Sequence, residues 1–276
     1  MSELRVPAAP AAGEARVNDE PRRLPTVTSL RHRRREKLGE AVAYEIVEGL
    51  VAGRFTPGEM LPSEAAMLEQ YGVSRPTMRE ALRILEVQGV VVMRPGQSGG
   101  PVYVGPSGEY LGRMASLHFH LRGASAADLL AARLLVEPAM ARMAAERQDP
   151  DAMAMLHAFV SGDPDPEAND AAYINQAPGF HMMLAQASGN GVLELMAEAM
   201  RHIANSVAMN ARWGGFGLPA EISKDVHDSH HEIAWAIING EGERAAELTS
   251  THDNQVVDWF VERDAQYKQR TVPWVR

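Results

Sequence analysis

The sequence predicts a mostly α-helical chain in two parts: an N-terminal part of three helices and a β-hairpin, and a larger C-terminal all-α helical bundle. Apolar residues recur at helical spacing from Leu38 onward, which favours helices. β-Branched residues gather in two short runs, 90–94 and 102–104, and no strand pattern follows Ser125. The chain has 276 residues, more than the ~250 at which single cores usually stop growing, so two domains are expected.

Composition excludes several classes of protein. Hydrophobic residues make up 45% of the chain and charged residues 23%, which is the balance of a globular protein and not of a disordered one. The absence of cysteine excludes disulfides and thiolate zinc sites, so any metal must be held by His, Asp or Glu. No apolar run approaches the ~18 residues of a membrane span, and the first residues lack the apolar core of a secretion signal. We therefore expect a cytoplasmic protein with no membrane partner.

The formal net charge of -9 is unevenly distributed along the chain. Residues 31–37 are strongly basic, whereas the acidic clusters lie in 164–170 and 241–264. Residues 1–35 are rich in Ala, Pro, Glu and Arg without apolar periodicity, which predicts a disordered basic arm. Such an arm could add phosphate contacts, and a solvated leader is the alternative interpretation.

We predict that the first domain spans residues 36–105. Apolar residues at every fourth position from Leu38 predict a helix that ends near Gly53. Ser63 is placed to cap a short second helix, and Ser74 to cap a third after a Gly turn. The two β-rich runs then flank a Gly-rich tip. This order of elements is that of a winged helix-turn-helix.

The third predicted helix has two distinct faces. One face is apolar and carries Met78, Ala81, Leu82 and Leu85. Another carries the basic residues Arg75, Arg79 and Arg83. In a helix-turn-helix such an outward Arg side chain can bond two acceptors of one guanine in the major groove. A solvated helix face is the alternative interpretation.

We predict a second domain over residues 124–268. A linker at 106–123 is expected before it and a short tail at 269–276 after it. Amphipathic spacing predicts helices over 125–147, around 153–156, and over 171–187, 192–212, 223–239 and 243–267. Arg133 and Glu137 lie four residues apart in the first of these helices. That spacing fits an intrahelical ion pair of ~0.2–0.5 kcal/mol. His227 and His231, one helical turn apart, predict surface neighbours.

The stretch LPSEAAMLEQYGVSRPTMREALRILEVQGVV, with the Gly-rich segment after it, closely resembles the GntR superfamily of bacterial regulators. The later chain is similar to the all-helical FCD-type effector domain of the FadR subfamily. The segments that carry this second resemblance are DLLAARLLVEPAMARMAA, FHMMLAQASGN and HEIAWAIINGEGERAAE. The resemblance implies a homodimeric transcription regulator that binds double-stranded operator DNA and a small-molecule effector.

The resemblance also assigns site residues. The family's DNA-reading positions fall on Ser74, Arg75, Thr77 and Arg79 of the third helix and on Gly96 and Gln97 at the hairpin tip. Most relatives have Arg after Leu-Pro-Ser-Glu, where this chain has Ala65, so one usual contact is missing. The positions of Arg133 and Glu137 point towards the effector cavity in the family.

The family's metal-binding members use one Asp and three His from different helices. The three His positions fall on His181, His230 and His252, whereas the Asp position is Ala177 here. Neutral imidazoles from three helices would suit a divalent zinc or nickel ion and leave coordination positions for water or an effector carboxylate. The alternative is a metal-free cavity for a larger or more apolar effector.

Together these features predict a ligand-responsive DNA-binding regulator, a repressor released by a small carboxylate or other metabolite. Two subunits would place two recognition helices on a two-fold symmetric operator. Two alternatives remain open: a metal-dependent hydrolase-like enzyme, and a DNA-binding adaptor whose bundle only dimerises. Because the sequence has no paired carboxylates, nucleophile elbow or phosphate loop, we expect no enzyme activity.

Overall fold

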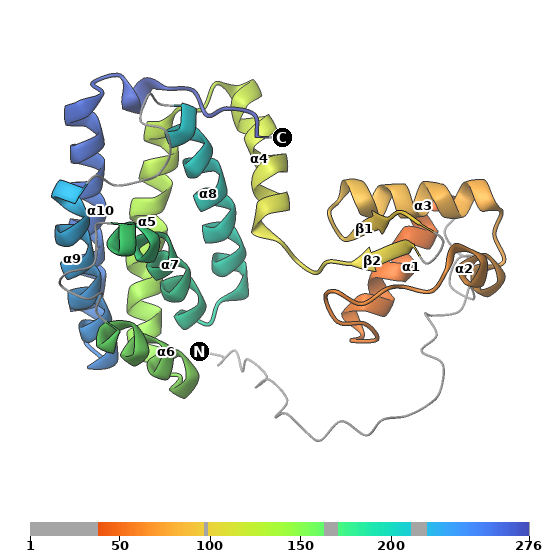
Figure 1. Cartoon of the computed structure of the whole chain (residues 1–276), viewed down its shortest axis with the longest axis horizontal. Coiled ribbons are helices and arrows are strands. Elements are labelled where there is room, and N and C mark those ends of the chain that lie inside the picture. Colours follow the sequence, from red (N-terminus) through yellow and green to blue (C-terminus); the bar gives the residue numbers. More distant parts are fainter. Residues whose placement is uncertain (1–37, 97–98, 163–170, 211–219, 276) are drawn as a thin grey trace, which may run out of the picture. The chain divides into compact units, whose positions relative to one another are not determined.

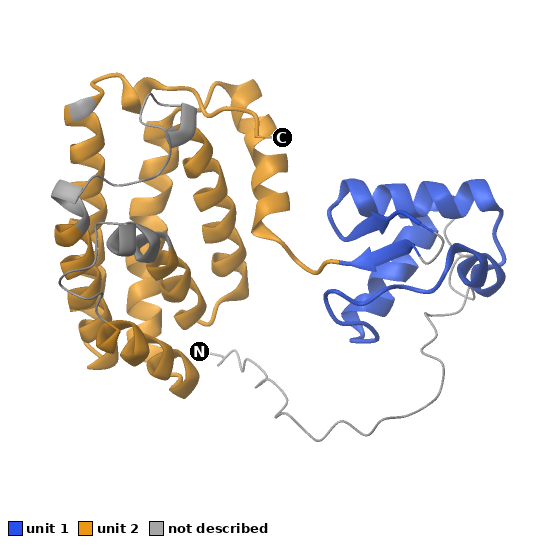
Figure 2. Ribbon diagram, in the orientation of Figure 1, with its two compact units in different colours: residues 1–103 blue, residues 104–276 orange. Residues whose placement is uncertain are grey.

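The computed structural model describes residues 38–96, 99–162, 171–210 and 220–275, without the side chains of 171–178, 208–210, 220–223 and 263. Its elements are labelled in Figure 1. The chain divides into two compact units, residues 1–103 and residues 104–276 (Figure 2). The expected basic arm, residues 1–35, lies outside the described residues.

The first unit has the predicted three helices and hairpin. Its elements are α1 (Leu38–Val51), α2 (Glu64–Tyr71), α3 (Arg75–Val87), β1 (Val91–Arg94) and β2 (Gly100–Tyr103). Ser63 caps α2, because its hydroxyl accepts a hydrogen bond from the Ala66 N–H at 3.2 Å. Gly72 ends α2 in the left-handed conformation, where a residue without Cβ has no steric cost. The predicted winged helix-turn-helix is confirmed.

The hairpin is tied to the connection between α1 and α2. β1 and β2 pair antiparallel, with Val91 opposite Tyr103. The Tyr103 N–H donates to the Glu59 carbonyl at 2.9 Å, and the Leu61 N–H to the Pro101 carbonyl at 2.8 Å. A Cβ on Gly99 would lie 2.2 Å from the Arg94 carbonyl oxygen, so the tight tip requires glycine there. The wing therefore projects from an anchored base.

The second unit is all-helical over its described residues. It contains α4 (Gly108–Arg122), α5 (Ala126–Arg147), α6 (Pro150–Ser161), α7 (Ala171–Ala187), α8 (Gly191–Asn210), α9 (Ala220–Ile238), α10 (Gly242–Arg263) and the short 3-10 helix η2 (Tyr267–Gln269). The long helix α5 packs mainly on α10, and α4 packs on α8 (Figure 1). Ser125 and Asp128 form a reciprocal capping box that begins α5.

The segment 106–123, which we predicted to be a linker, contains the helix α4 and belongs to the second unit. Two glycines allow α4 to approach α8 closely. The Gly108 N–H donates to Glu198 Oε2 at 2.9 Å, and a Cβ on Gly112 would lie 2.9 Å from the Ala199 carbonyl oxygen. Glycine and polar residues on α4 hide its apolar spacing in the sequence, so the linker prediction was wrong for this part.

The C-terminal tail packs back across α4 and the start of α5. The last long helix ends at Arg263, four residues before the predicted end. The Val272 N–H donates to the Ala124 carbonyl at 2.8 Å, and His120 Nδ1 donates to the Val272 carbonyl at 2.9 Å. Val272 is buried with Leu129 and Ile203. The tail is thus part of the packed second unit.

Each unit has its own apolar core. In the first unit, α1 and α3 contribute most of the buried side chains, among them Val42, Ile46, Met78, Leu82 and Leu85. In the second, the main cluster joins α5, α6, α7 and α9 through residues that include Met140, Leu156, Phe180, Leu184, Ile233 and Ile237. None of the helices in the described part of the chain is long and apolar enough to cross a membrane.

Candidate DNA and effector sites

The N-terminal end of α3 is an exposed polar surface. Ser74 begins the helix, but its side chain makes no capping bond; its hydroxyl lies 2.9 Å from the Thr77 hydroxyl. The Arg75 side chain is 73% exposed, and its Nε lies 3.8 Å from Glu64 Oε1. At that exposure the pair with Glu64 contributes little, so the guanidinium can leave it for another partner. Arg79 is also exposed, one turn along the helix.

The remaining predicted DNA-contact positions lie in the wing. Gly96 is exposed and has a φ of +112°, a conformation that favours glycine. Gln97 lies outside the described residues. Met78, Leu82 and Leu85 fill the core below α3, so the helix presents its other face outward. This geometry is that of a recognition helix beside a wing.

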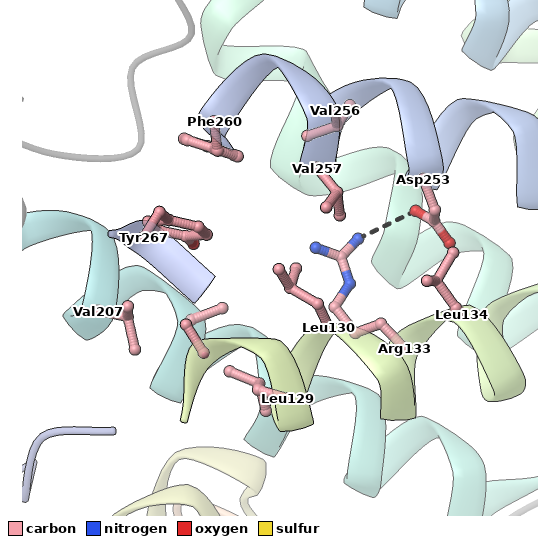
Figure 3. Close-up of a pocket in the computed structure, with 12 residues that line it drawn as sticks. Leu129, Leu130, Arg133, Leu134, Val207, Asp253, Val256, Val257, Phe260 and Tyr267 are labelled. Carbon is pink, nitrogen blue, oxygen red and sulfur yellow. Dashed lines mark hydrogen bonds and ion pairs between the residues drawn. The ribbon is translucent and has the colours of Figure 1, made fainter. Parts of the chain in front are cut away.

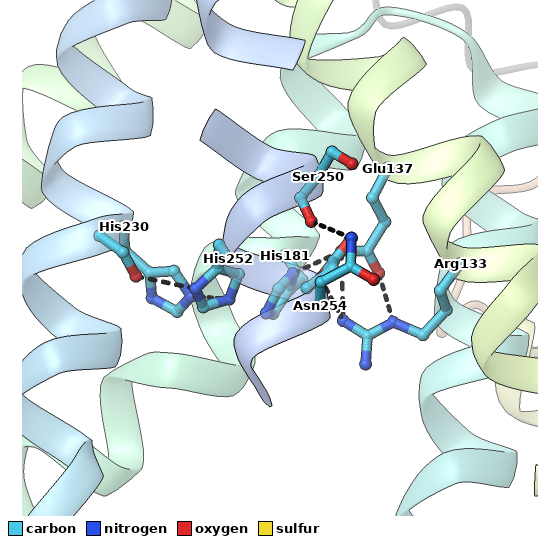
Figure 4. Close-up of polar contacts among 9 residues, drawn as sticks. Arg133, Glu137, His181, His230, Ser250, His252 and Asn254 are labelled. Carbon is cyan, nitrogen blue, oxygen red and sulfur yellow. Dashed lines mark hydrogen bonds and ion pairs between the residues drawn. The ribbon is translucent and has the colours of Figure 1, made fainter. Parts of the chain in front are cut away.

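In the second unit, three helices bring the three predicted histidines together. His181 comes from α7, His230 from α9 and His252 from α10 (Figure 4). One ring nitrogen of each lies within 4.8 Å of the others, and His230 Nε2 lies 3.1 Å from His252 Nε2. Phe180 stacks on the His230 ring at a centroid distance of 4.2 Å, which links the cluster to the apolar core.

A buried ion-pair network adjoins the histidines. His181 Nδ1 lies 2.8 Å from Glu137 Oε2. Arg133 donates two hydrogen bonds to Glu137, of 2.7 and 3.1 Å, and a third to Asp253 Oδ1 at 3.4 Å. Figure 4 shows the three histidines next to Glu137 and Arg133. The predicted pair of Arg133 and Glu137 therefore forms, but as part of a larger cluster.

Burial and neighbouring charges set the protonation of this cluster. Burial opposes the charged form of Glu137, but Arg133 and His181 outweigh it and hold the pKa of Glu137 well below its usual value. Burial, and then the nearby Glu137 carboxylate, raise the pKa of Asp253 to about 7. Burial lowers the pKa of His230 well below its usual value and that of His252 to about 3. Both of these imidazoles are therefore neutral at physiological pH.

The donor set fits a divalent transition metal. Neutral imidazoles carry the lone pairs that such a metal needs, and three histidine rings converge in the site. Ala177, at the position of the family's Asp, has no ligand atom. Glu137, His181 and Asp253 form a second group of close ligand atoms, but Glu137 is already bonded to His181 and Arg133. Three protein ligands with an open fourth position is the pattern of accessible metal sites.

A cavity lies on the other side of Arg133, between α5, α8, α10 and η2 (Figure 3). Its volume is about 20 Å³, room for roughly one water. Apolar residues form most of its wall, and Arg133, Asp253 and Tyr267 are its polar residues. Asp253 Oδ2 is buried and has no hydrogen-bond partner among the described residues.

A larger groove of about 580 Å³ runs between α9 and α10. Ser229 and His252 line it together with the acidic residues Asp225, Asp228, Glu232, Asp258 and Glu262. The groove gives the histidine cluster an acidic approach from solvent, and clefts lined by one sign of charge concentrate ions of the opposite sign.

Sequence reasoning missed Ser229, Asp253 and Tyr267. Asp253 meets Arg133 from a helix 120 residues away, a separation at which no sequence spacing carries a signal. His227 and His231 are neighbours, as predicted, with ring centroids 4.3 Å apart, but the predicted surface position was wrong for His227. His227 is buried, and both rings pack against Phe159 of α6.

Two known domain families match this chain, in the expected order. Residues 38–99 match the family described as bacterial regulatory proteins of the gntR family, and residues 128–255 match the FCD domain. Together these regions make up more than half of the chain. The chain belongs to the GntR family and carries an FCD domain. The matched families and the names of the relatives are those of transcription regulators and not of enzymes.

The relatives of this GntR-family chain include transcriptional repressors. The HTH-type transcriptional repressors NanR of Shigella sonnei and of Escherichia coli K12 are each 30% identical over 161 residues, which is 57% of this chain and 60% of the relative. The match thus spans less than two thirds of the length of these relatives. A solved GntR structure from Streptococcus agalactiae matches 80% of this chain and 99% of its own with a TM-score of 0.61 at 24% identity, which supports the fold.

Proposed function

We propose that this GntR-family chain is a cytoplasmic, homodimeric transcriptional repressor that binds operator DNA and releases it when an effector binds the FCD domain. The exposed Arg75 and Arg79 on α3, backed by a packed apolar face, are the observation that carries the proposal. The names of the NanR relatives support a repressor.

In this proposal α3 enters the major groove. Arg75 is the first candidate for reading a base, since its guanidinium is exposed and held only by a long contact to Glu64. Arg79 and the Ser74 and Thr77 hydroxyls would contact bases or phosphates beside it. Gly96 and Gln97 in the wing would place backbone N–H groups against the phosphates. An alanine at position 65 leaves this surface one basic side chain short of its relatives.

Selection of bound duplexes from a random DNA pool tests the DNA-binding part. The full chain should enrich a two-fold symmetric sequence, because a homodimer presents α3 twice. Fluorescence anisotropy should then show tighter binding to the selected duplex than to a scrambled one at physiological salt. Equal affinities for the two duplexes would contradict specific operator recognition.

We further propose that His181, His230 and His252 hold a divalent zinc or nickel ion. The convergence of three imidazoles, two of them buried and kept neutral by burial, supports this assignment. A bound metal would supply positive charge and an open coordination position in the bundle. The acidic groove between α9 and α10 would favour the approach of a cation to His252.

The charge balance of the site bears on the effector. The two bonds from Arg133 to Glu137 compensate the charge of its guanidinium, so an effector carboxylate would have to share this guanidinium with Glu137. With Ala177 in place of the family's Asp, three imidazole ligands would supply no negative charge to a divalent ion. An anionic effector would therefore be held at the histidines, with Arg133 and Glu137 forming one wall beside it.

Elemental analysis of untagged protein, followed by thermal melts with and without chelator, tests the metal assignment. A ligand that binds only the native state stabilises it by RT ln(1 + [L]/Kd), about 2.7 kcal/mol at a hundredfold excess over Kd. Chelator should therefore lower the melting temperature, and His230→Ala should abolish this response. His118→Ala, which removes an exposed imidazole on α4, is the matched control. If the protein contains no metal, and zinc or nickel does not raise its melting temperature, the proposed metal site at the three histidines is contradicted.

A homodimer is supported by an apolar groove of about 380 Å³ formed by α4, α5 and α8. Leu111, Phe119 and Met196 line this groove, and all three are exposed in the single chain. Exposed apolar surface of this kind is typical of interaction sites. Analytical ultracentrifugation should find a dimer, and Met196→Glu should weaken it. A monomer at all concentrations would contradict the proposal.

A further inference from the structure

Ser229 links the backbone of α9 to the ring of His252 on α10. Its hydroxyl lies 2.8 Å from the Val226 carbonyl oxygen of its own helix and 2.8 Å from His252 Nδ1. His252 has its other ring nitrogen, Nε2, 3.1 Å from His230 Nε2. The His252 ring is therefore held at both of its nitrogens, and its centroid lies 4.5 Å from that of His230 and 5.5 Å from that of His181 (Figure 4).

The direction of these hydrogen bonds follows from counting protons. A serine hydroxyl has one hydrogen, and a backbone carbonyl can only accept. Ser229 donates its hydrogen to the Val226 carbonyl. Its oxygen must therefore accept from His252 Nδ1–H, and a neutral imidazole with hydrogen on Nδ1 has its lone pair on Nε2.

The same count applies to His181. The Glu137 carboxylate can only accept, so His181 Nδ1 at 2.8 Å carries a hydrogen. Two unrelated residues, a carboxylate on α5 and a hydroxyl on α9, thus accept a hydrogen bond from the Nδ1 atoms of two histidines. A metal-bound imidazole usually donates its second nitrogen to a neighbouring group in this way.

His230 differs from the other two. Because His252 Nε2 has no hydrogen in this arrangement, the 3.1 Å bond between the two Nε2 atoms requires the hydrogen to lie on His230 Nε2. A metal shared by the three rings needs that position as a lone pair, so the hydrogen of His230 must move to Nδ1.

We propose that Ser229 is a positioning residue that fixes His252 in the tautomer able to bind a metal, while His230 is the histidine that changes tautomer on binding. The metal-binding half of this proposal rests on the proposed function, whereas the tautomer of His252 is a property of the metal-free protein. Ser229 also lines the groove between α9 and α10, so water can partly replace its hydroxyl.

The first experiment is nitrogen-15 NMR of the metal-stripped full chain labelled at histidine, with the ring signals assigned by single His variants. Wild type should show His252 and His181 protonated at Nδ1 and His230 at Nε2. In Ser229→Ala, His252 should become a mixture of tautomers. Ser206→Ala is the matched control, because Ser206 also donates to a carbonyl of its own helix, at 3.3 Å, and is equally half-buried. A His252 ring protonated at Nε2 in wild type would overturn the proposal.

The second experiment measures zinc affinity by competition with a chromophoric chelator. Removal of an outer hydrogen-bond partner typically costs about 10- to 100-fold in metal affinity, and Ser229→Ala should fall at the lower end because water can substitute. Ser229→Thr keeps the hydroxyl and should restore the affinity, and Ser206→Ala should match wild type. Wild-type affinity in Ser229→Ala overturns the positioning role. If wild type binds no zinc, the proposed metal site fails, and the NMR result still decides the tautomer.

Discussion

The arginines of α3 and Arg133 of the buried ion-pair network differ in exposure and in the number of their partners. Arg75 is 73% exposed and touches one carboxylate at 3.8 Å, whereas Arg133 is 15% exposed and bonds Glu137 at 2.7 Å and Asp253 at 3.4 Å. Water screens the first guanidinium and leaves it free for a new partner. The second is part of the folded structure. Removing Arg75 should therefore change DNA binding, and removing a partner of Arg133 should change the stability of the fold.

The largest expected effect comes from breaking the buried network. Glu137→Leu removes the main partner of Arg133 and leaves its buried charge with only the longer contact to Asp253, and breaking a buried ion pair in this way typically costs ~3–5 kcal/mol of folding free energy. Urea unfolding followed by circular dichroism measures it. Glu243→Leu is the control, because its ion pair with Arg142 is exposed and should contribute no more than ~1 kcal/mol.

A further variant tests the cause of that loss. Arg133→Met combined with Glu137→Leu removes both charges, and replacing a buried ion pair with apolar residues is often neutral or stabilising. The double variant should therefore be more stable than Glu137→Leu alone. A double variant as unstable as the single one would indicate that lost packing, and not the orphaned charge, explains the effect.

The exposed side of the comparison predicts a loss of binding without a loss of stability. Arg75→Ala should weaken binding to the selected operator by ~1–3 kcal/mol, the usual value of a bidentate contact to a base. Anisotropy on selected and scrambled duplexes measures it, and the melting temperature should not change. Equal losses on both duplexes would make Arg75 a phosphate contact.

These two regions also differ in how far the sequence predicts them. The exposed surface of α3 comes from one short stretch of the chain. The glycine turn, the serine before the helix and the spacing of the arginines could therefore be recognised from the sequence alone. The histidine cluster joins α5, α7, α9 and α10, and helical periodicity says nothing about which helices meet. The resemblance to known relatives supplied His181, His230 and His252, whereas Asp253 and Ser229 needed the fold.

The missed helix α4 has a physical cause as well. Its buried positions include Gly108, Gly112 and Ser116, which carry no apolar signal although they pack closely against their neighbours. Close backbone approach selects small residues, and a search for apolar periodicity overlooks them. Ser116 also accepts a hydrogen bond from the Val275 N–H at 3.0 Å. The packing of the tail on α4 therefore carries no apolar signal in the sequence either.

The tail provides the next smaller effect. Val272 is 1% exposed, and Val272→Ala removes about two buried carbon groups, each worth about 0.8 kcal/mol. The second unit should lose about 1.5 kcal/mol of unfolding free energy. Val192→Ala is the control, since Val192 is 68% exposed and its loss should be near zero. A silent Val272→Ala would mean that the tail is not packed on the bundle in solution.

The smallest effects should separate folding from binding within the first unit, where Ser63 and Ser74 each precede a helix. The Ser63 hydroxyl accepts the Ala66 N–H, whereas the Ser74 hydroxyl makes no capping bond and faces Thr77 on the exposed surface. Ser63→Ala should therefore cost ~1 kcal/mol of stability and leave DNA affinity unchanged. Ser74→Ala should cost less stability but weaken operator binding by ~0.5–1.5 kcal/mol, the net value of one hydrogen bond.

Thermal melts and anisotropy on the same two variants measure both quantities. The two serines serve as controls for each other, because each substitution removes one serine hydroxyl from the start of a helix. The opposite result, with Ser74→Ala the less stable variant and its DNA affinity intact, would show that Ser74 acts as an ordinary helix cap. The DNA-contact surface of α3 would then begin at Arg75.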